Sequence, residues 1–457
     1  MSSPLGPLSP TSSQPPGRVQ ALRLLVLFVL VLGLQIPALF MTFLVSERRA
    51  RRDEAATEIA SKWGAQQTLT GPALVVPWKQ RWTTTDDKGV RTEHEAMQRL
   101  VLLPESLHVT ARLQTETRRR GIYGVPVYRL DARLEGRFEK PDFAKLEVQP
   151  ESIDWTRAVL ALGVSDARAI QEQVEVDWGG REVEFEPGVG DAAELGGGIH
   201  AELGLAGEPW EQPFTVPIRL NGTKGVYFTP FGKQTRVELS GAWKDPSFQG
   251  QWLPAERTVA DSGFRATWSI PSLGRNFPQA WTAAPDPAAT IQRSAFGLDL
   301  VPAIDAYRLC ERTLKYALLF FVLTFTAFWL LEVLSGRLLH PIQYVLIGAA
   351  LCLFQLLELS LSEHVGFGVS YAIASAAVVG LIVHYATAVL GSRGRALLVG
   401  AGLGLLYAFH FVVLRNEDYA LLLGSLLFFG ALAAVMSLTR RIDWYSGGPG
   451  ANRGAGA

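Results

Sequence analysis

Residues 24–45 read LLVLFVLVLGLQIPALFMTFLV, an apolar run without a single charged side chain. At a rise of about 1.5 Å per residue, a helix of this length crosses a hydrocarbon core of about 30 Å. A cleaved signal peptide is the alternative, but its apolar core would span only about 7–15 residues and end at a small-x-small cleavage site, which this sequence lacks. The run therefore predicts an uncleaved membrane anchor.

Five more apolar stretches lie between Tyr316 and Leu438, where only nine residues are charged. Each stretch is long enough to span a bilayer. The sequence thus predicts a membrane protein with six transmembrane α-helices, one N-terminal anchor and a five-helix C-terminal cluster. The expected spans are Leu24–Val45, Tyr316–Leu334, Ile342–Leu361, Val365–Leu390, Ala396–Leu414 and Tyr419–Leu438.

The residues between the first two spans form a large β-rich domain in this interpretation. Tyr128, Leu130, Ala132 and Leu134 alternate with charged residues, which is typical of a strand with one wet face. Ten tryptophans between Trp63 and Trp281 indicate a large core. The sequence leaves open whether this core belongs to one domain or is divided between two. Further strands are expected at Ala73–Trp78, Leu107–Thr117, Val159–Val164, Phe214–Leu220, Arg236–Ala242 and Arg265–Ile270, with a hairpin turning at Gly179-Gly180.

Helices are expected at three places around this domain. Residues 46–62 should prolong the first span, Ser165-Asp166 should cap a short helix ending near Gln173, and Asp305 to Lys315 should run straight into the second span. The expected organisation is a disordered tail at 1–20, an anchor at 21–45, the β-rich domain at 46–310, the helical domain at 311–445 and a disordered tail at 446–457.

Charge placement predicts the orientation in the membrane. With six spans and cytoplasmic termini, the cytoplasmic segments hold eight arginines and the short outer loops hold only Arg415. This bias is counted over short segments, whereas long domains cross largely regardless of charge. The arginines that follow the first span therefore do not outweigh the bias of the short segments. The sequence predicts a multi-pass protein of the bacterial inner membrane with both termini in the cytoplasm and a periplasmic β-rich domain. The eight are Arg18, Arg23, Arg337, Arg393, Arg395, Arg440, Arg441 and Arg453.

The chemistry of the chain predicts neither an enzyme nor a cofactor. Basic and acidic residues balance at 43 each, which favours no nucleic-acid partner. The sequence has no Walker A motif, no Gly-x-Ser-x-Gly and no His-Glu-x-x-His. His94, His108 and His200 are too scattered to suggest a metal cluster. An envelope hydrolase would need a nucleophile and base, and the sequence indicates no such pair.

Ionisable residues in the membrane part suggest a candidate site. Counting turns places Glu358, Glu363, His364 and His410 close together at the outer face of the helical cluster. A buried carboxylate is costly unless paired, and a histidine is its natural partner. Two interpretations remain open: a polar pair that holds helices together, or a pH-responsive site that couples the outer domain to the helices.

Several separated segments resemble the CreD family of inner-membrane proteins. In the outer domain they are Leu220-Asn-Gly222, Phe228-Thr-Pro230-Phe-Gly232, Trp243-Lys-Asp-Pro246-Ser247-Phe248-Gln-Gly250, Leu253-Pro254 and Gly263-Phe264-Arg-Ala266-Thr-Trp268. In the helical part they are Asp305-Ala-Tyr307, Arg312-Thr-Leu-Lys315-Tyr316, Leu361-Ser-Glu363-His364, Glu417-Asp418-Tyr419 and Thr439-Arg440-Arg441-Ile-Asp443-Trp444-Tyr445. Trp243, Pro246, Ser247, Phe248, Gly250 and Trp268 form the candidate structural motif of the outer domain.

The resemblance implies a role in cell-envelope integrity and tolerance of envelope stress, without catalytic residues to carry over. The resulting hypothesis is a non-enzymatic protein that contacts membrane lipids and binds an unknown envelope component or protein partner through its outer domain. The alternative is a transporter or lipid-handling permease that uses the five-helix cluster. Large aromatics at strand-like spacing are interpreted as core rather than as a ligand platform.

Overall fold

The computed structural model describes residues 17–89, 91–210, 212–282, 287–300, 305–335, 339–416 and 418–440. The chain divides into two compact units, one formed by residues 1–51 and 304–457 and the other by residues 52–303. The expected tail at 446–457 lies outside the described residues, as do Glu417, Arg337, Arg441 and Arg453. At the other end, helix α1 (Gly17–Trp63) begins inside the stretch 1–20 that was expected to be disordered.

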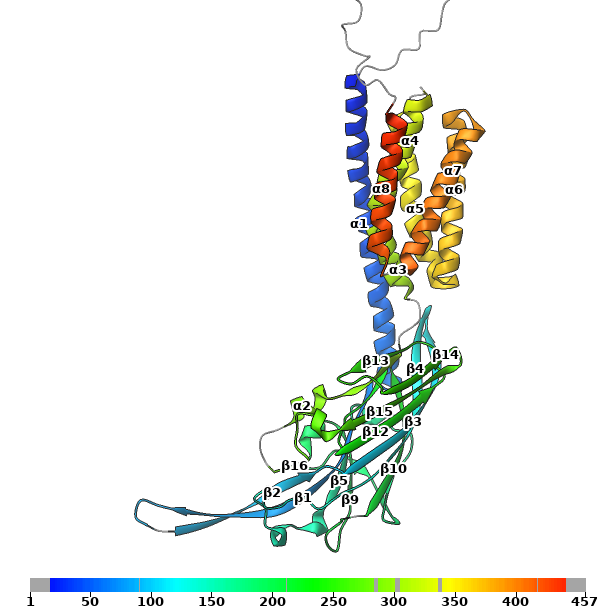
Figure 1. Cartoon of the computed structure of the whole chain (residues 1–457). Helices are drawn as coiled ribbons and strands as arrows, with labels where there is room; N and C mark the ends of the chain where they lie inside the picture. The colour runs from blue at the N-terminus through cyan, green and yellow to red at the C-terminus, as the bar shows by residue number, and fades with distance from the viewer. Residues whose placement is uncertain are drawn as a thin grey trace, which may run out of the picture. The chain divides into compact units, whose positions relative to one another are not determined.

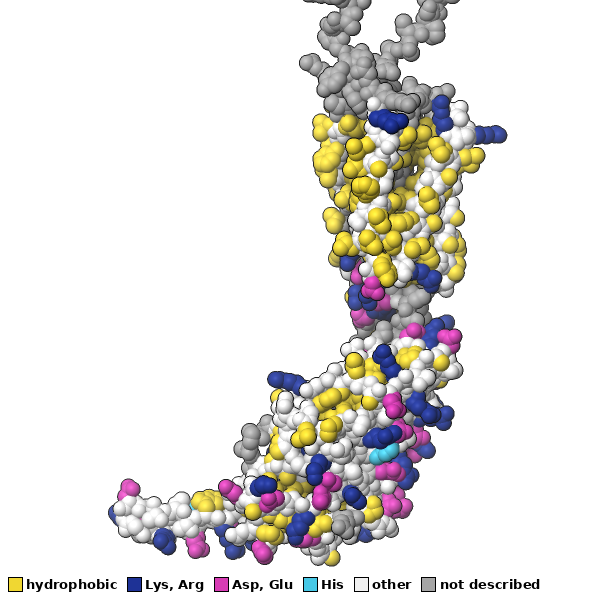
Figure 2. All heavy atoms as spheres, in the orientation of Figure 1, with side chains coloured by type: hydrophobic (Ala, Val, Ile, Leu, Met, Phe, Trp, Pro, Cys, Tyr) yellow, Lys and Arg dark blue, Asp and Glu magenta, His cyan; other side chains and the backbone are white. Residues whose placement is uncertain are grey.

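The first unit consists of helices. Five of the described helices are long and apolar enough to cross a membrane, and the bent pair α3–α4 passes the same test when taken together. Apolar side chains cover the surface of these helices in Figure 2, and the exposed fractions of Leu421 and Phe429 reach 87% and 73%. Besides α1, the helices are α3 (Ala306–Lys315), α4 (Ala317–Ser335), α5 (Pro341–Val365), α6 (Phe367–Leu390), α7 (Arg393–Arg415) and α8 (Ala420–Thr439) (Figure 1).

Helix α3 does not run straight into the next span, which corrects the prediction made from the sequence. Its axis is bent by 46° from that of α4, with the break at Tyr316. The Asp305 carboxylate accepts a hydrogen bond from the Tyr307 amide and so caps the start of α3. Only one side of α3 is buried, through Tyr307, Cys310 and Thr313. The bend therefore turns three side chains toward the helical bundle.

In two of the helix pairs, a side chain of one helix packs closely against a glycine of the other. A Cβ atom added at Gly348 of α5 would lie 2.3 Å from Leu34 Cδ1 of α1, and one added at Gly400 of α7 would lie 2.4 Å from Val383 Cγ2 of α6. Small residues allow such approaches in membrane helices. Arg23 of α1 also forms an ion pair with Glu332 of α4, whose other oxygen accepts from the Tyr344 hydroxyl at 3.0 Å. The N-terminal anchor thus contacts α4 and α5 along one side, and most of its apolar side chains, such as Ile36 at 71%, stay exposed.

The second unit is built from two β-sheets. One has the strand order β13-β17-β11-β1-β5-β9-β8, with β2 pairing β1 and β16 pairing β2; the other has the order β14-β15-β12-β3-β4-β10-β6-β7. The first comprises β1 (Gln67–Thr85), β2 (Arg91–Leu102), β5 (Val159–Val164), β8 (Glu186–Pro187), β9 (Gly198–Glu202), β11 (Gly225–Phe228), β13 (Pro246–Gly250), β16 (Ala280–Trp281) and β17 (Phe296–Leu300). The second comprises β3 (Ser106–Arg120), β4 (Tyr123–Arg137), β6 (Glu175–Trp178), β7 (Arg181–Glu184), β10 (Pro213–Thr223), β12 (Gln234–Gly241), β14 (Glu256–Ala260) and β15 (Gly263–Pro271); a short helix, α2 (Ala288–Arg293), precedes β17.

The period-two patterns lie where strands were expected. Tyr128, Leu130, Ala132 and Leu134 of β4 are buried, whereas the charged residues between them are exposed. The hairpin at Gly179-Gly180 joins β6 to β7, with Trp178 paired to Arg181. The expected helix near Gln173 is wrong, because only a single 3₁₀ turn forms at Ala167–Ala169.

One hydrophobic core lies between the two sheets. Trp268 of β15 contacts Phe296 of β17, with ring centroids 5.6 Å apart, and the Tyr128 hydroxyl of β4 donates to the Gly225 carbonyl of β11 at 2.7 Å. Burial away from water raises the pKa of Tyr128, so the phenol stays a neutral donor. The sheets therefore belong to one domain rather than two, and residues 52–303 form one compact unit.

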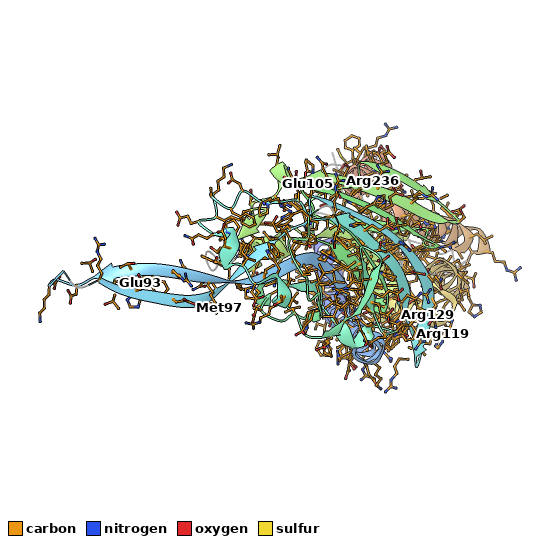
Figure 3. The ribbon with its side chains drawn as sticks, turned by 90° about the horizontal axis from the view of Figure 1, so that it is seen from below. Glu93, Met97, Glu105, Arg119, Arg129 and Arg236 are labelled. Carbon is orange, nitrogen blue, oxygen red and sulfur yellow. The ribbon has the colours of Figure 1, made fainter. Side chains whose placement is uncertain are left out.

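A two-stranded ribbon projects from this domain. Strands β1 and β2 pair from Leu74–Leu102 out to Thr85–Arg91, and residues beyond the Trp78–Gln98 pair are largely exposed on both faces. Figure 3 shows Glu93 and Met97 on this ribbon, away from the rest of the domain. The Trp82 and His94 rings stack at 5.3 Å on its surface, with Trp82 44% exposed.

Candidate functional site

Glu358 is buried near the C-terminal end of α5. Its side chain accepts a hydrogen bond from the Thr313 hydroxyl of α3 at 2.9 Å, and the residue is only 1% exposed. Thr313 reaches Glu358 because α3 is bent away from the axis of α4. Beside this contact, the Cys310 sulfur of α3 lies 3.9 Å from the Ser362 hydroxyl of α5. The carboxyl group thus has a hydroxyl partner rather than the histidine expected from the sequence.

Glu363, five residues further along α5, is more exposed to solvent than Glu358. Its carboxylate accepts from the Tyr307 hydroxyl at 2.9 Å and lies 4.0 Å from the Arg48 guanidinium of α1. His364, the next residue, is exposed and does not join Glu358 in the interior. Of the four residues predicted to gather, two carboxylates therefore contact α3 and one histidine faces outward.

His410 of α7 is also buried, with 3% of its surface exposed. Its Nδ1 lies 3.0 Å from the Tyr371 hydroxyl of α6, which also donates to the Tyr407 carbonyl at 2.9 Å. A phenol has one hydrogen to donate, so Nδ1 carries a proton and donates to Tyr371 when the phenol donates to Tyr407. In that tautomer Nε2 is an acceptor, and it has no hydrogen-bond partner among the described residues.

Glu358 and His410 face the same interior without bonding to each other. Phe354, one turn before Glu358, contacts the rings of Tyr371 and Tyr407 at 5.4 Å and 4.7 Å. The His410 ring in turn contacts Tyr371 at 5.9 Å. A series of aromatic contacts therefore links the turn of α5 before Glu358 to His410 of α7.

Polar atoms without partners continue from this cluster to the middle of the helices. Within the described part of the chain, Tyr407 Oη, Gln355 Oε1 and Thr324 Oγ1 are buried and form no hydrogen bond. Gln355 is the fifteenth of the 25 residues of α5, and Thr324 is the eighth of the 19 in α4. Sequence reasoning, which looked for ionisable groups, missed these neutral ones at mid-depth. The signal available in the sequence was the occurrence of Gln355 and Thr324 within helical stretches that are otherwise apolar.

Buried polar atoms of this kind usually bond to internal water. The cluster holds an acceptor nitrogen, a phenol and an amide oxygen, together with the carboxyl group of Glu358. Such groups can bind water or pass a proton between neighbours. Among the described residues, no group of three or more His, Cys, Asp and Glu is placed to hold a metal ion.

The aromatic motif of the outer domain lies at the joint between the two sheets. Trp268 is fully buried, and its indole Nε1 donates to the Trp252 carbonyl at 3.1 Å. Phe248 of β13 packs edge-on against Trp268 of β15, with ring centroids 5.8 Å apart. Trp243 is half-buried at the rim and donates to the Asp245 carbonyl at 3.2 Å.

The remaining motif residues shape the chain around this joint. Pro246 and Ser247 pair with Leu300 and Asp299 of β17 and are half-buried. Gly250 has φ +98°, and a Cβ there would lie 2.3 Å from the Ala295 carbonyl oxygen. Only glycine suits such a position. These residues are placed to hold β13 against β17.

A buried arginine explains another of the segments quoted from the sequence. Arg275 donates to the carbonyls of Pro230 and Phe231, both at 2.7 Å, and also bonds to Gln279. Burial lowers the pKa of this guanidinium to about 10. The backbone carbonyls of the Phe228–Gly232 segment therefore bind the guanidinium of Arg275, a residue that was not predicted from the sequence.

Comparison with known proteins identifies the family. The family model described as "Inner membrane protein CreD" matches residues 20–445. This chain belongs to the CreD family. It is 34% identical over 428 residues to the inner membrane protein CreD of Escherichia coli (strain K12), and the match covers 92% of each protein. The resemblance seen in the sequence is confirmed, and with it the assignment to an inner-membrane protein family.

Two of the segments that carried the resemblance to the CreD family meet in the structure. Tyr307 belongs to the first and Glu363 to the second, and their side chains are joined by the 2.9 Å hydrogen bond described above. Arg312, from a third segment, donates to the Val413 carbonyl of α7 at 3.2 Å. Helix α3 is therefore the element through which residues of these segments connect α5 and α7.

Proposed function

We propose that this chain is a non-enzymatic protein of the bacterial inner membrane that supports cell-envelope integrity under stress, its outer domain binding an envelope component or a protein partner. Membership of the CreD family supports the envelope role. The observation that carries the binding role is the projecting ribbon, which exposes Trp82 and Met97 at 44% and 47%. Trp82 pairs with His94 and Met97 pairs with Lys79, so the two apolar side chains lie on opposite faces of the ribbon and offer a partner a contact on either face.

The motif residues have structural roles in the fold. Trp268 and Phe248 pack the core, Arg275 holds backbone carbonyls, and Tyr307 joins two helices. These roles stabilise a scaffold.

The proposed topology has six spans, with both termini in the cytoplasm and the β-rich domain in the periplasm. It counts the bent pair α3–α4 as one span, and the arginine bias of the short segments supports the orientation. An alkaline phosphatase fusion at Gly190 should be active, and one after Arg395 should be inactive. The reverse pattern would refute this orientation.

A complementation experiment tests the envelope role. In a bacterium deleted for its CreD-family gene, the wild-type chain should restore growth under an agent that targets the envelope. The empty vector serves as the control for growth. Full expression in the membrane without any gain in growth would count against the proposal.

Site-specific photo-cross-linking tests the binding role. A photoreactive residue at Met97 on the ribbon should give a discrete cross-linked product in intact cells. The same residue at the exposed Leu421 of α8, an apolar position on the bundle, is the control. Identical products from both positions would mean that the ribbon has no partner of its own.

A transporter or lipid-handling permease is the second candidate. It is favoured by the buried unpartnered atoms of Gln355, Tyr407 and Thr324 at mid-depth, because a polar pathway needs such groups across the apolar core. In a protein whose two native cysteines, Cys310 and Cys352, are replaced by serine, Gln355→Cys should then react with a small membrane-impermeant thiol reagent, whereas Ala374→Cys in the buried part of α6 should not. If neither cysteine reacts, the transport proposal loses its support.

A further inference from the structure

An open groove of about 870 Å³ lies on the outer domain where β3, β12, β14 and β15 meet. The volume falls within the range of roughly 300–1,000 Å³ typical of small-molecule sites. The groove forms where β12 ends at Gly241, while β3 continues to Arg120 and the β14–β15 hairpin turns at residues 261–262. Thr115 of β3 crosses this end, its hydroxyl donating to the Ala242 carbonyl at 3.2 Å.

Four polar side chains form a row across the groove. Strand register pairs Arg112 with Ser240, Ser240 with Arg265 and Arg265 with Thr258. Directly paired residues point to the same face of a sheet. Two strand spacings separate the two arginine backbones, about 10 Å in all, so both side chains can converge on one ligand above Ser240.

The charges on this sheet face distinguish the groove from its surroundings. Arg133 forms an ion pair with Glu135 at 2.5 Å, Arg236 pairs with Glu238 at 2.9 Å, and Arg219 pairs with Glu172 at 2.8 Å. Arg112 and Arg265, in contrast, are exposed and form no ion pair or hydrogen bond among the described residues.

Four acidic residues lie near the groove, and none of them forms an ion pair with Arg112 or Arg265 among the described residues. Glu238 and Glu256 lie in the neighbouring row of the sheet, where both pair with Thr267. Asp131 is the strand partner of Arg112, but its carboxylate bonds to Arg219 on the far side at 3.6 Å. Asp261 lies in the exposed β14–β15 turn and is not among the described residues that line the groove. Two like charges facing one groove favour an anion between them.

We propose that this groove binds a phosphate group, chemically a phosphate monoester or diphosphate, held between Arg112 and Arg265. A guanidinium bonds to phosphate oxygens in a bidentate manner, and two guanidiniums match the two negative charges of such a group. The hydroxyls of Ser240 and Thr258 supply further donors. The proposal deepens the proposed function, because it rests on the outer domain being a binding module for an envelope component.

The test uses the full-length protein in nonionic detergent micelles at fixed ionic strength, with pyrophosphate as the titrated probe. We expect saturable binding in calorimetry. Arg112→Gln and Arg265→Gln should each weaken it about tenfold or more, and the double variant should show none. The matched control is Arg133→Gln, which removes a positive charge from the same face but leaves binding within about twofold. Unchanged circular dichroism and melting temperature establish that each variant is folded.

Two further titrations distinguish the source of the phosphate. Dihexanoyl phosphatidic acid presents it as a lipid headgroup, and succinate presents two carboxylates instead. Arginine-dependent binding of phosphatidic acid alone supports a lipid headgroup as ligand, and binding of pyrophosphate alone supports a soluble phosphate. The proposal is overturned if neither phosphate compound saturates the protein, if succinate binds as tightly, or if Arg133→Gln weakens binding as much as Arg112→Gln.

These results are separable from those of the envelope proposal. Failure of all phosphate titrations removes the phosphate site and leaves complementation of envelope growth to be judged on its own. Failure of the wild-type chain to restore growth removes the envelope role, while an arginine-dependent phosphate site would still stand.

Discussion

Gly222 of β10 lies directly opposite Tyr128 of β4, and the tyrosine ring covers the glycine. A Cβ at position 222 would lie 2.3 Å from Tyr128 Cζ and Oη. The ring is fully buried, and its hydroxyl is fixed by the bond to the Gly225 carbonyl of the opposite sheet. This pairing ties a glycine from one of the segments that resemble the CreD family to the contact that joins the two sheets.

Gly222→Ala should therefore destabilise the outer domain. The added methyl group cannot fit unless Tyr128 moves, and overpacking of this kind costs about 1–3 kcal/mol. Thermal unfolding followed by tryptophan fluorescence measures the effect. Gly207→Ala is the control, because a Cβ there meets no atom within 4 Å. Equal melting temperatures for the two variants would contradict the argument.

Trp268→Ala should lower the abundance of the protein strongly. Truncating a buried aromatic residue to alanine costs about 3–5 kcal/mol, a large part of the 5–15 kcal/mol typical of a domain. Phe248→Ala should cost less, since its side chain is only half-buried. Trp82→Ala on the ribbon is the matched control and should accumulate like the wild type. A Phe248→Ala protein that accumulates normally yet fails to protect the envelope would instead indicate a binding surface.

Asp166 should make the stability of the outer domain depend on acid pH. Hydrogen bonds from Arg168, together with one from the Ala65 amide, lower the pKa of its carboxyl group. A lowered folded-state pKa means that the contribution is present above the unfolded pKa, about 3.9, and is lost as the pH falls through the folded value.

Asp166→Asn measures this contribution. Because Arg168 is largely exposed, the expected loss at neutral pH is only about 1 kcal/mol. The difference between wild type and variant should shrink as the pH is lowered from 5 to 2. A difference that stays constant over this range would show that the charge of Asp166 contributes nothing.

Glu358 separates the two interpretations of the membrane cluster. We expect Glu358→Leu to reduce protein abundance, because the buried carboxyl group loses its hydrogen bond with Thr313. Glu358→Gln keeps an acceptor for Thr313, so its level and its protection of the envelope should stay near those of the wild type. Immunoblotting and growth under an envelope-targeting agent measure both. A Glu358→Gln protein that reaches a normal level without giving protection would point to an ionisable switch.

The parts of the fold predicted from the sequence are those with a local signal. Leu130, Ala132 and Leu134 alternate with charges, and the strand follows from that pattern alone. The spans follow from long apolar runs. The partners of Phe248 could not be predicted in the same way, because Phe264 and Trp268 belong to the other sheet.

The candidate site was only partly predictable for the same reason. Turn counting placed Glu358 and His410 near the same end of the helical cluster, but their partners come from other helices. Thr313 reaches Glu358 only because α3 bends by 46°, and the sequence between Lys315 and Ala317 contains no glycine or proline that would have signalled it. Arg275 was missed because arginine is normally a surface residue, whereas here backbone carbonyls replace water.

The ribbon of β1 and β2 has a consequence for experiments on the living cell. Lys79 to Thr85 pairs with Arg91 to Met97, so opening these residues breaks their own hydrogen bonds and leaves the core intact. Local opening of such an element is governed by its own small free energy. Amide hydrogens on the ribbon should exchange long before those of β3 and β4, and a protease should nick the chain near Lys88 without unfolding the domain. The tip is therefore a natural point at which to insert an epitope or a fluorophore that reports on this protein.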